Sequence, residues 1–580
     1  MKEFHGIMAS PGIAVGEAYI FKQIELSIPK YSIKTEDVKK EMDRFDSAVE
    51  KATVEVENLK SAVNDNAHGR ELELLDSHIL MMNDPELKKQ INVSLNDQKR
   101  NVEWILIQVI EDMIAQLKLS RDEYLNERSM DIRDMSNRIL NQLLYQEQAS
   151  LTGLEKPCIV VTHNLMPSDA IGMDKDKVLG IATDAGGKTS HTAILARSLE
   201  IPAVLGLMDI SRYVKDGDKI ILDGNSGKVI VNPDKKTRSV YLNTKEKWEK
   251  HEKDLLQLNR LAAETKDGKL INLEANIEIP EEVNSVIFHG ADGIGLFRSE
   301  FLYIQPNKFP DEEEQCRAYK SVLESLKGKS VTIRTLDLGG DKQVPGLNMT
   351  EEKNPILGWR AIRYCLSQPD IFKIQLRALL RASVHGNLKI MFPMISGVEE
   401  VEHSLEIYET AKKELKAEGI EFNENIPIGI MIEIPSAAVT TDILAKKVDF
   451  FSIGTNDLIQ YTIAVDRGNE RIAYLYEPFH PGVLRLIQLT IENGHKQGIP
   501  VGMCGEMASN PLATVILLGM GLDEFSMSSI SIPEIKRIIR STAILDAEEV
   551  VGNIMEMKSY SEITKYLKNW MREYFDFETY

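Results

Sequence analysis

Residues 428–457 of this chain read IGIMIEIPSAAVTTDILAKKVDFFSIGTND. Two short apolar runs, Ile428–Ile432 and Phe450–Ile453, lie on either side of a helix-forming segment. Parallel strands that are covered on both faces have this near-continuous apolar character. Glu433 follows the first run, and Asn456–Asp457 follow the second. The stretch therefore predicts a strand–helix–strand unit in which each strand ends in polar side chains.

The same pattern recurs through the second half of the chain. Six further apolar runs share it: Asn272–Ile277, Gly293–Phe297, Val331–Thr335, Lys389–Pro393, Val501–Cys504 and Glu524–Met527. Helical segments separate most of the runs, and eight such units in about 300 residues predict a (β/α)8 barrel, whose active site lies at the carboxyl ends of its strands. Two arginines, several carboxylates and a thiol follow these runs, as in an anion- and metal-binding site. We therefore expect an enzyme.

The composition is that of a multidomain globular protein. With 580 residues the chain is too long for one hydrophobic core. A formal net charge of −20 disfavours general binding to nucleic acid or to anionic membranes, whereas it would favour a basic protein partner. The N-terminus lacks a signal-peptide pattern, and no run reaches membrane-spanning length. Four widely spaced cysteines without a paired ligand pattern indicate reduced thiols, so we expect a cytoplasmic protein.

Residues 21–145 have the apolar spacing of a helical bundle. Apolar residues between positions 35 and 64 alternate at intervals of four and three along one heptad seam: Val38, Met42, Phe45, Val49, Ala52, Val56, Leu59 and Val63. A second stripe, Leu72 to Met82, stops at Asp84–Pro85, and further helical patterns cover Trp104–Leu117 and Ile132–Leu144. These stripes predict helices that pack against one another.

Short β-type runs replace the helical pattern beyond the bundle: Cys158–Val161, Val178–Ile181, Ala203–Leu205, Lys219–Leu222 and Val229–Val231. The segment GIMASPGIAVGEAYIF near the N-terminus has the same character and offers two short strands around a Pro-Gly turn. We expect residues 1–20 and 146–233 to form one α/β domain into which the bundle is inserted. Residues 234–265 are expected to be a helical linker, and 266–580 the barrel.

One histidine has an unusual setting. The segment GGKTSHTAILAR, residues 186–197, passes from a Gly pair through capping residues into a helical pattern. Thr189 or Ser190 is a natural N-cap, which places His191 in the first turn. The helix dipole there would stabilise an added phosphoryl group and keep the imidazole neutral and nucleophilic. A phosphohistidine intermediate is the functional interpretation; the alternative is a histidine that merely begins a helix.

Polar groups after the predicted barrel strands indicate an anion and metal site. Arg298 and Arg334 each follow a strand, and two converging guanidinium groups can hold a phosphate. Glu433 and Asp457 are candidate Mg²⁺ ligands, because Mg²⁺ prefers carboxylates, substrate oxygens and water. Arg360 and Lys342 could hold a substrate carboxylate. The alternative for a single strand-end arginine is an ordinary surface ion pair.

Cys504 ends the seventh predicted strand, in the sequence GMCGE. A thiol at this position could donate a proton to an enolate carbon during tautomerisation. A free cysteine is also commonly a small buried residue in a strand. Spacing alone does not separate these two interpretations.

Seven long motifs resemble the phosphoenolpyruvate–protein phosphotransferases, the enzyme I family of the bacterial sugar phosphotransferase system. They occur in family order across essentially the whole chain: ASPGIAVG (9–16), GGKTSHTAILARS (186–198), GADGIGLFRSEFLY (290–303), IRTLDLGGDK (333–342), NPILGWRAIR (354–363), FFSIGTNDLIQYT (450–462) and GMCGEMASNP (502–511). Three departures stand out, namely Lys188 for a commoner Arg, Glu278 for a small residue and Gly346 for a larger one. None removes a candidate catalytic group.

The resemblance implies a residue-by-residue assignment. His191 would accept the phosphoryl group of phosphoenolpyruvate, and Cys504 would protonate the enolate. The implied substrate-binding residues are Arg298, Arg334, Asn456, Asp457 and Arg467, and the implied Mg²⁺ ligands are Glu433 and Asp457. The resemblance further implies that the bundle docks the histidine-containing phosphocarrier protein HPr and that the barrel forms a homodimer. Because His191 must face the barrel in one step and the carrier in the other, we expect residues 1–233 to swivel about the connector 234–265.

Three other functions share some of these features. A pyruvate–phosphate dikinase or phosphoenolpyruvate synthase has the mobile histidine and the barrel, but it also needs a nucleotide-binding domain, of which no Gly-rich loop is found here. A barrel lyase acting on pyruvate-like acids leaves the histidine domain unexplained. An acidic docking protein explains only the bundle. A nitrogen-regulatory paralogue is disfavoured because residues 1–20 leave no room for a sensory domain.

Overall fold

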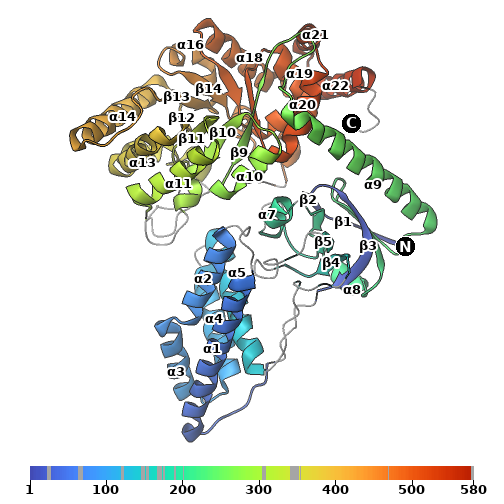
Figure 1. Ribbon diagram of the computed structural model, residues 1–580, viewed down its shortest axis with the longest axis vertical. Coiled ribbons are helices and arrows are strands. Elements are labelled where there is room, and N and C mark those ends of the chain that lie inside the picture. The colour runs from blue at the N-terminus through green and yellow to red at the C-terminus, as the bar shows by residue number, and fades with distance from the viewer. Residues whose placement is uncertain are drawn as a thin grey trace. The chain divides into compact units, whose positions relative to one another are not determined.

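The computed structural model describes residues 1–21, 28–62, 69–118, 123–144, 156–165, 177–187, 191–199, 201–303, 309–339, 354–467 and 471–575, and the single residues 151, 154, 173, 352 and 469. They form two compact units, Met1–His251 and Glu252–Tyr580 (Figure 1). Among the described residues, no helix is both long enough and apolar enough to span a membrane.

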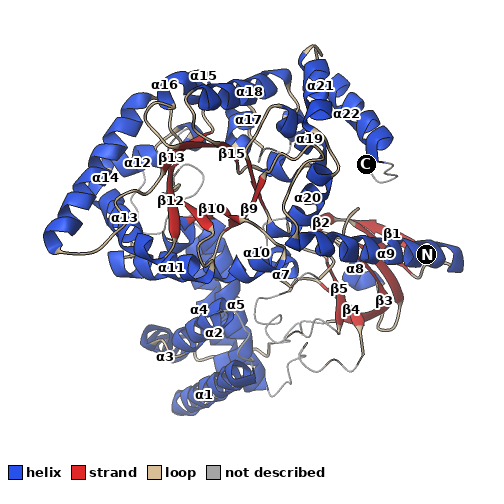
Figure 2. Ribbon diagram, turned by 45° about the horizontal axis from the view of Figure 1, so that its top comes forward, coloured by secondary structure: helices blue, strands red, loops and turns tan. Residues whose placement is uncertain are grey.

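The second unit is a closed barrel of eight parallel strands, ringed by helices (Figure 2). The strands are β9 Asn272–Ile277, β10 Gly293–Arg298, β11 Ser330–Arg334, β12 Asn387–Phe392, β13 Ile428–Ile432, β14 Phe450–Ile453, β15 Val501–Met503 and β16 Glu524–Met527. Each strand pairs with the next along the chain, and β16 closes on β9. The predicted barrel is confirmed, and each predicted run overlaps one of its strands.

Helices lie between the barrel strands and also follow the last strand, β16. They are α10 Val283–Phe288, α11 Glu312–Ser325, α12 Ile362–Ser367, α13 Pro369–Ala382, α14 Val398–Glu418, α15 Pro435–Val439, α16 Thr441–Leu444, α17 Thr455–Ile463, α18 Pro481–Lys496, α19 Pro511–Gly519, α20 Ile532–Arg540, α21 Ile544–Met555 and α22 Tyr560–Phe575. One apolar core lies between this helical layer and the strands. A small apolar cluster that includes Leu296, Met431 and Cys504 is separate from this core.

The first unit contains an eight-stranded sheet in the order β1-β8-β7-β3-β4-β5-β6-β2. Its strands are β1 Lys2–His5, β2 Ile7–Ser10, β3 Ile13–Ile20, β4 Cys158–Thr162, β5 Val178–Thr183, β6 Ala203–Leu205, β7 Lys219–Asp223 and β8 Lys228–Val231, with helices α7 His191–Ser198 and α8 Ile210–Tyr213. The N-terminal strands therefore share a sheet with strands from beyond residue 157. Strand β1, which the sequence did not predict, pairs antiparallel with β8.

Among its described residues the same unit has five helices before β4: α1 Val38–Ala62, α2 Gly69–Met82, α3 Pro85–Gln98, α4 Val102–Lys118 and α5 Glu123–Leu144. Val38, Phe45, Val49, Ala52 and Val56 of the heptad seam are buried, as the pattern predicted. Leu59 and Val63 lie outside the residues whose side chains are described. Helix α9, Lys235–Leu256, follows the sheet and crosses the boundary between the two units.

Candidate active site

The carboxyl end of β11 places Arg334 in a buried polar network. Its Nη2 donates to Glu300 Oε1 at 2.8 Å, and its Nη1 lies 3.1 Å from Asp337 Oδ2 and 3.8 Å from the Met431 sulfur. Burial lowers the pKa of Arg334, but the carboxylates of Glu300 and Asp337 outweigh it and hold the pKa above its ordinary value. The guanidinium is therefore a fixed positive charge at this end of the barrel.

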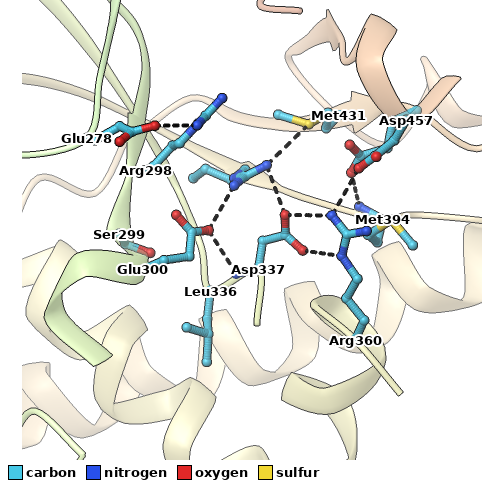
Figure 3. A network of polar contacts seen from close by, with 12 residues as sticks. Glu278, Arg298, Ser299, Glu300, Leu336, Asp337, Arg360, Met394, Met431 and Asp457 are labelled. Carbon is cyan, nitrogen blue, oxygen red and sulfur yellow. Dashed lines mark hydrogen bonds and ion pairs between the residues drawn. The ribbon is translucent and has the colours of Figure 1, made fainter. Parts of the chain in front are cut away.

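Arg360 extends the network to Asp457. Its Nε and Nη2 donate to the two oxygens of Asp337 at 2.8 and 3.1 Å, and Nη2 also donates to Asp457 Oδ2 at 3.0 Å (Figure 3). Asp457 lies in the first turn of α17, where the positive end of the helix dipole favours a carboxylate. Arg360 is thus engaged by two protein carboxylates, while Lys342 lies outside the described residues.

Glu433 follows β13 and is buried beside Asp457. Its Oε1 accepts a hydrogen bond from the Met394 backbone N–H at 2.6 Å. Burial, followed by the charges of Asp457 and Asp337, raises the pKa of Glu433 to about 8. A Cβ at Gly454 would lie 3.0 Å from Glu433 Oε2, so the second oxygen lies against the loop that leads to Asp457. Two such carboxylates repel each other, and a cation would relieve the repulsion.

Arg298, the last residue of β10, already has an anionic partner. Its Nη1 donates to Glu278 Oε1 at 2.6 Å, and both side chains are partly exposed (Figure 3). Glu278 is one of the three departures from the resembled family, in which a small residue is usual at this position. The predicted anion-binding arginine is therefore paired with a carboxylate of this chain.

Asn456 and Arg467 come together around Glu506. Asn456 Oδ1 accepts from the Glu506 backbone N–H at 2.9 Å, and its Nδ2 donates to Glu506 Oε1 at 3.2 Å. Arg467 Nη1 lies 3.8 Å from the same carboxylate oxygen. All three side chains are exposed or half-buried, so they line the accessible part of the strand ends.

Cys504 directly follows β15 and is buried. It packs with Leu296 and Met431 in the small apolar cluster, and its Sγ lies 3.9 Å from the Ile453 carbonyl oxygen. Burial raises the pKa of the thiol to about 11. The group consequently stays protonated at neutral pH, as a proton donor must. Burial is equally expected of a structural cysteine, so its role remains a prediction.

His191 is the first residue of α7, as the capping pattern predicted. Helix α7 is anchored through Thr192, whose Oγ1 donates to the Leu165 carbonyl oxygen at 3.2 Å, and through the buried Ala193 and Ala196. The candidate capping residues Thr189 and Ser190, like Lys188, lie outside the described residues. The side chain of His191 also lies outside the described part of the structure. The backbone nevertheless places this histidine at a helix N-terminus.

The barrel brings six of the predicted residues into electrostatic contact: Arg298, Arg334, Arg360, Glu433, Asp457 and Cys504. Their roles remain predictions. Two residues that organise the network, Glu300 and Asp337, were not predicted. The available signal was their position: Glu300 comes two residues after Arg298, in the 3-10 helix Ser299–Tyr303, and Asp337 comes three residues after Arg334, in the loop after β11.

Three family descriptions match the chain: the N-terminal part of PEP-utilising enzymes over residues 5–128, their mobile domain over 154–227 and their PEP-binding domain over 252–544. The phosphoenolpyruvate-protein phosphotransferase of Staphylococcus aureus (strain MSSA476) is 43% identical over 571 residues, which cover 98% of this chain and 100% of that protein. The enzyme of the same name from Priestia megaterium is 43% identical over 568 residues, covering 98% and 99%. The chain belongs to the phosphoenolpyruvate–protein phosphotransferase family.

A phosphoenolpyruvate–protein phosphotransferase is a transferase, which confirms that the chain is an enzyme and decides against the acidic docking protein and the barrel lyase. The near full-length match also decides against a dikinase or synthase. The PEP-binding match covers the barrel strands, so phosphoenolpyruvate is the substrate. The NMR solution structure of an Enzyme I protein is 39% identical and covers 42% of this chain and 99% of that one, with a TM-score of 0.39.

Proposed function

We propose that this transferase moves the phosphoryl group of phosphoenolpyruvate to His191 and then to a histidine of the phosphocarrier protein HPr, releasing pyruvate. This relay would be the first step of sugar uptake by the phosphotransferase system. The observation that supports it best is the grouping of Arg298, Arg334, Glu433 and Asp457 at the carboxyl ends of the barrel strands. Cations and paired carboxylates together suit a phosphate ester that binds with a metal ion.

In the first step an imidazole nitrogen of His191 attacks phosphorus. A P–N bond forms as the P–O bond to the enolpyruvate breaks, and the electron pair leaves on the enolate oxygen. Arg298 and Arg334 would hold the phosphoryl oxygens, while Asn456 and Arg467 would hold the rest of the substrate. Phosphoryl transfer asks mainly for positioning and for stabilisation of charge, which these side chains can supply.

The enolate then becomes pyruvate by protonation at carbon. Cys504 is the proposed donor, because its pKa of about 11 keeps the thiol protonated at neutral pH. The thiolate that results regains a proton from water. In the second step the P–N bond of His191 breaks as a P–N bond to the carrier histidine forms.

Mg²⁺ is the proposed cofactor, with Glu433 and Asp457 as its protein ligands. Each carboxylate uses one oxygen in a protein contact, and their mutual repulsion favours a bound cation. Within the described residues no three His, Cys, Asp or Glu side chains form a ready metal cluster. Mg²⁺ suits a site with two carboxylates, because it normally completes its shell with substrate oxygens and water. When bound it would neutralise charge on the phosphoryl oxygens.

The partners are also proposals. The bundle α1–α5 would dock HPr, and the net charge of −20 would favour a basic carrier surface. The barrel would form a homodimer. The four cysteines are free thiols, which supports a reducing, cytoplasmic setting.

The relay is tested by incubating the full chain with radiolabelled phosphoenolpyruvate and Mg²⁺ without nucleotide. The wild type should acquire an acid-labile, base-stable phosphate, which is characteristic of phosphohistidine. His191→Ala should acquire none and should still bind HPr. His163→Ala is the control, because this exposed histidine of the same unit pairs with Asp184 and should label normally. Labelling of His191→Ala would refute the proposal.

A further inference from the structure

Asp337 occupies the centre of the polar network, and the relay proposed above gives it no role. The residue is completely buried. Its Oδ1 accepts from Arg360 Nε at 2.8 Å, and its Oδ2 lies 3.1 Å from both Arg360 Nη2 and Arg334 Nη1 (Figure 3). One carboxylate therefore holds two guanidinium groups that come from different parts of the chain.

A buried carboxylate is costly unless it is paired and hydrogen-bonded, so the arrangement needs a reason. The contact with Arg360 is bidentate, which fixes the plane of that guanidinium as well as its distance. Arg334 contacts two carboxylates, Asp337 through its Nη1 and Glu300 through its Nη2. Neither arginine can turn independently of Asp337.

Backbone contacts also join the segments that carry Asp337 and Arg360. Gly339 and Arg360 form an isolated antiparallel bridge, and the Ala361 N–H donates to the Leu338 carbonyl oxygen at 2.9 Å. Gly339 has a φ of 110°, and a Cβ there would lie 2.3 Å from the Trp359 carbonyl oxygen. Ala361 itself has a φ of 55°, which a non-glycine residue adopts only when its surroundings impose it. The segment carrying Asp337 and the segment carrying Arg360 are thus fastened together.

The network also reaches Asp457. Arg360 Nη2 donates to Asp457 Oδ2 at 3.0 Å, while Arg334 lies on the other side of Asp337. Contacts therefore run without a break from the strand-end arginine of β11 to the first turn of α17. A change at Asp337 would shift the two ends relative to each other.

We propose that Asp337 is a positioning residue for phosphoryl transfer. Through Arg334 on one side and Arg360 on the other, it sets the place of the phosphate-binding arginine relative to Asp457, the proposed metal ligand. The inference rests on the proposed function. Phosphoryl transfer depends on alignment, so an error of about 1 Å between these groups slows the reaction about 100-fold.

A matched control exists on the outer helices of the barrel. Glu312, at the start of α11, also lies between two arginines, with Arg377 Nε 2.7 Å from its Oε2 and Arg381 Nη1 2.8 Å from its Oε1. Its contacts involve α11 and α13 rather than the strand ends. Glu312→Gln therefore removes a comparable carboxylate without touching the proposed site.

The test compares Asp337→Asn, Glu312→Gln and the wild type as full-length chains. Single-turnover labelling by phosphoenolpyruvate should slow about 10- to 100-fold in Asp337→Asn, because residues that support metal ligands have effects of this size. Binding of Mn²⁺, used as a spectroscopic probe for the Mg²⁺ site, should weaken about tenfold in the same variant. Glu312→Gln should match the wild type in both measurements. Thermal unfolding is recorded for all three.

Labelling and Mn²⁺ affinity of Asp337→Asn within about twofold of the wild type would overturn the inference, as would an equal loss in Glu312→Gln. If Asp337→Asn does not fold, Arg360→Lys replaces it in the test. Lysine retains the positive charge but cannot make the bidentate contact with Asp337. This variant should also label more slowly and bind Mn²⁺ more weakly. Wild-type activity in Arg360→Lys would then overturn it. A wild-type chain that takes no label refutes the relay, whereas the Mn²⁺ comparison still decides the role of Asp337.

Discussion

The pairing of Arg298 with Glu278 has a direct consequence for substrate affinity. If phosphoenolpyruvate binds Arg298 as proposed, it has to displace the Glu278 carboxylate from Arg298 Nη1, 2.6 Å away, before it can use the full guanidinium. Partly exposed ion pairs contribute about 0.2–1 kcal/mol. Glu278→Ala should therefore lower the KM for phosphoenolpyruvate by a factor of about 1.4 to 5 with little change in kcat, as measured by steady-state transfer to HPr.

Glu313 provides the control for Glu278. Its Oε2 lies 2.7 Å from Arg381 Nη2 on the outer helices, and its side chain is 60% exposed, compared with 62% for Glu278. Glu313→Ala removes the same charge from a similar pair, so it accounts for any general gain in attraction for an anion. A fall in KM of equal size in both variants would contradict direct competition at Arg298.

The site residues that the sequence predicted and those that it missed differ in their position relative to the barrel strands. Arg334 and Glu433 lie at or directly after an apolar run, so strand periodicity alone places them at the carboxyl ends. Asp337 lies in a loop and Glu300 in the 3-10 helix Ser299–Tyr303, and the strand periodicity fixes the direction of neither side chain. Their importance comes from contacts with arginines that are distant in sequence, which only the folded chain reveals.

The barrel strands were predictable because parallel strands covered on both faces are almost wholly apolar. Strands β9, β13, β14 and β16 have the predicted bounds. Helix α3 was missed, because Asp84–Pro85 was interpreted only as the end of α2. The same residues also begin α3: Asp84 accepts from the Glu86 N–H at 2.8 Å, and Pro85 occupies the first helical position.

Strand β9 contains a buried carboxyl that should make the barrel sensitive to pH. Burial, then the neighbouring Glu524 carboxylate, raises the pKa of Glu274 well above 4.5. The folded chain therefore keeps a proton that the unfolded chain releases above about pH 4.5. Stability should fall as the pH rises above that value, by at most about 1.4 kcal/mol per pH unit, until the folded carboxyl also ionises.

Glu274→Gln cannot ionise and should escape this loss. Thermal unfolding of the wild type and the variant between pH 5 and pH 8 should show the wild type losing stability relative to Glu274→Gln as the pH rises. Glu312→Gln should follow the wild type. Parallel pH profiles for the wild type and Glu274→Gln would mean that the barrel does not hold this proton.

The two proposed steps differ in which of the two units they need. His191 and the bundle α1–α5 belong to the unit Met1–His251, and the proposed substrate site belongs to Glu252–Tyr580. Transfer from phosphoenolpyruvate to His191 requires the two units to meet, while transfer from His191 to HPr requires only the first. Helix α9 is the connection through which the first step must be coordinated.

Lengthening that connection should separate the two steps. About ten Gly and Ser residues inserted after His251 would lower the effective concentration of His191 at the barrel, so the first step should slow about tenfold. Transfer from prephosphorylated chain to HPr should keep its wild-type rate, because the groups proposed for it, His191 and the bundle α1–α5, lie in Met1–His251. Rapid-quench measurement of each step makes the comparison. An unchanged rate of the first step, or equal slowing of both steps, would contradict the proposal that the first step needs both units and the second only Met1–His251.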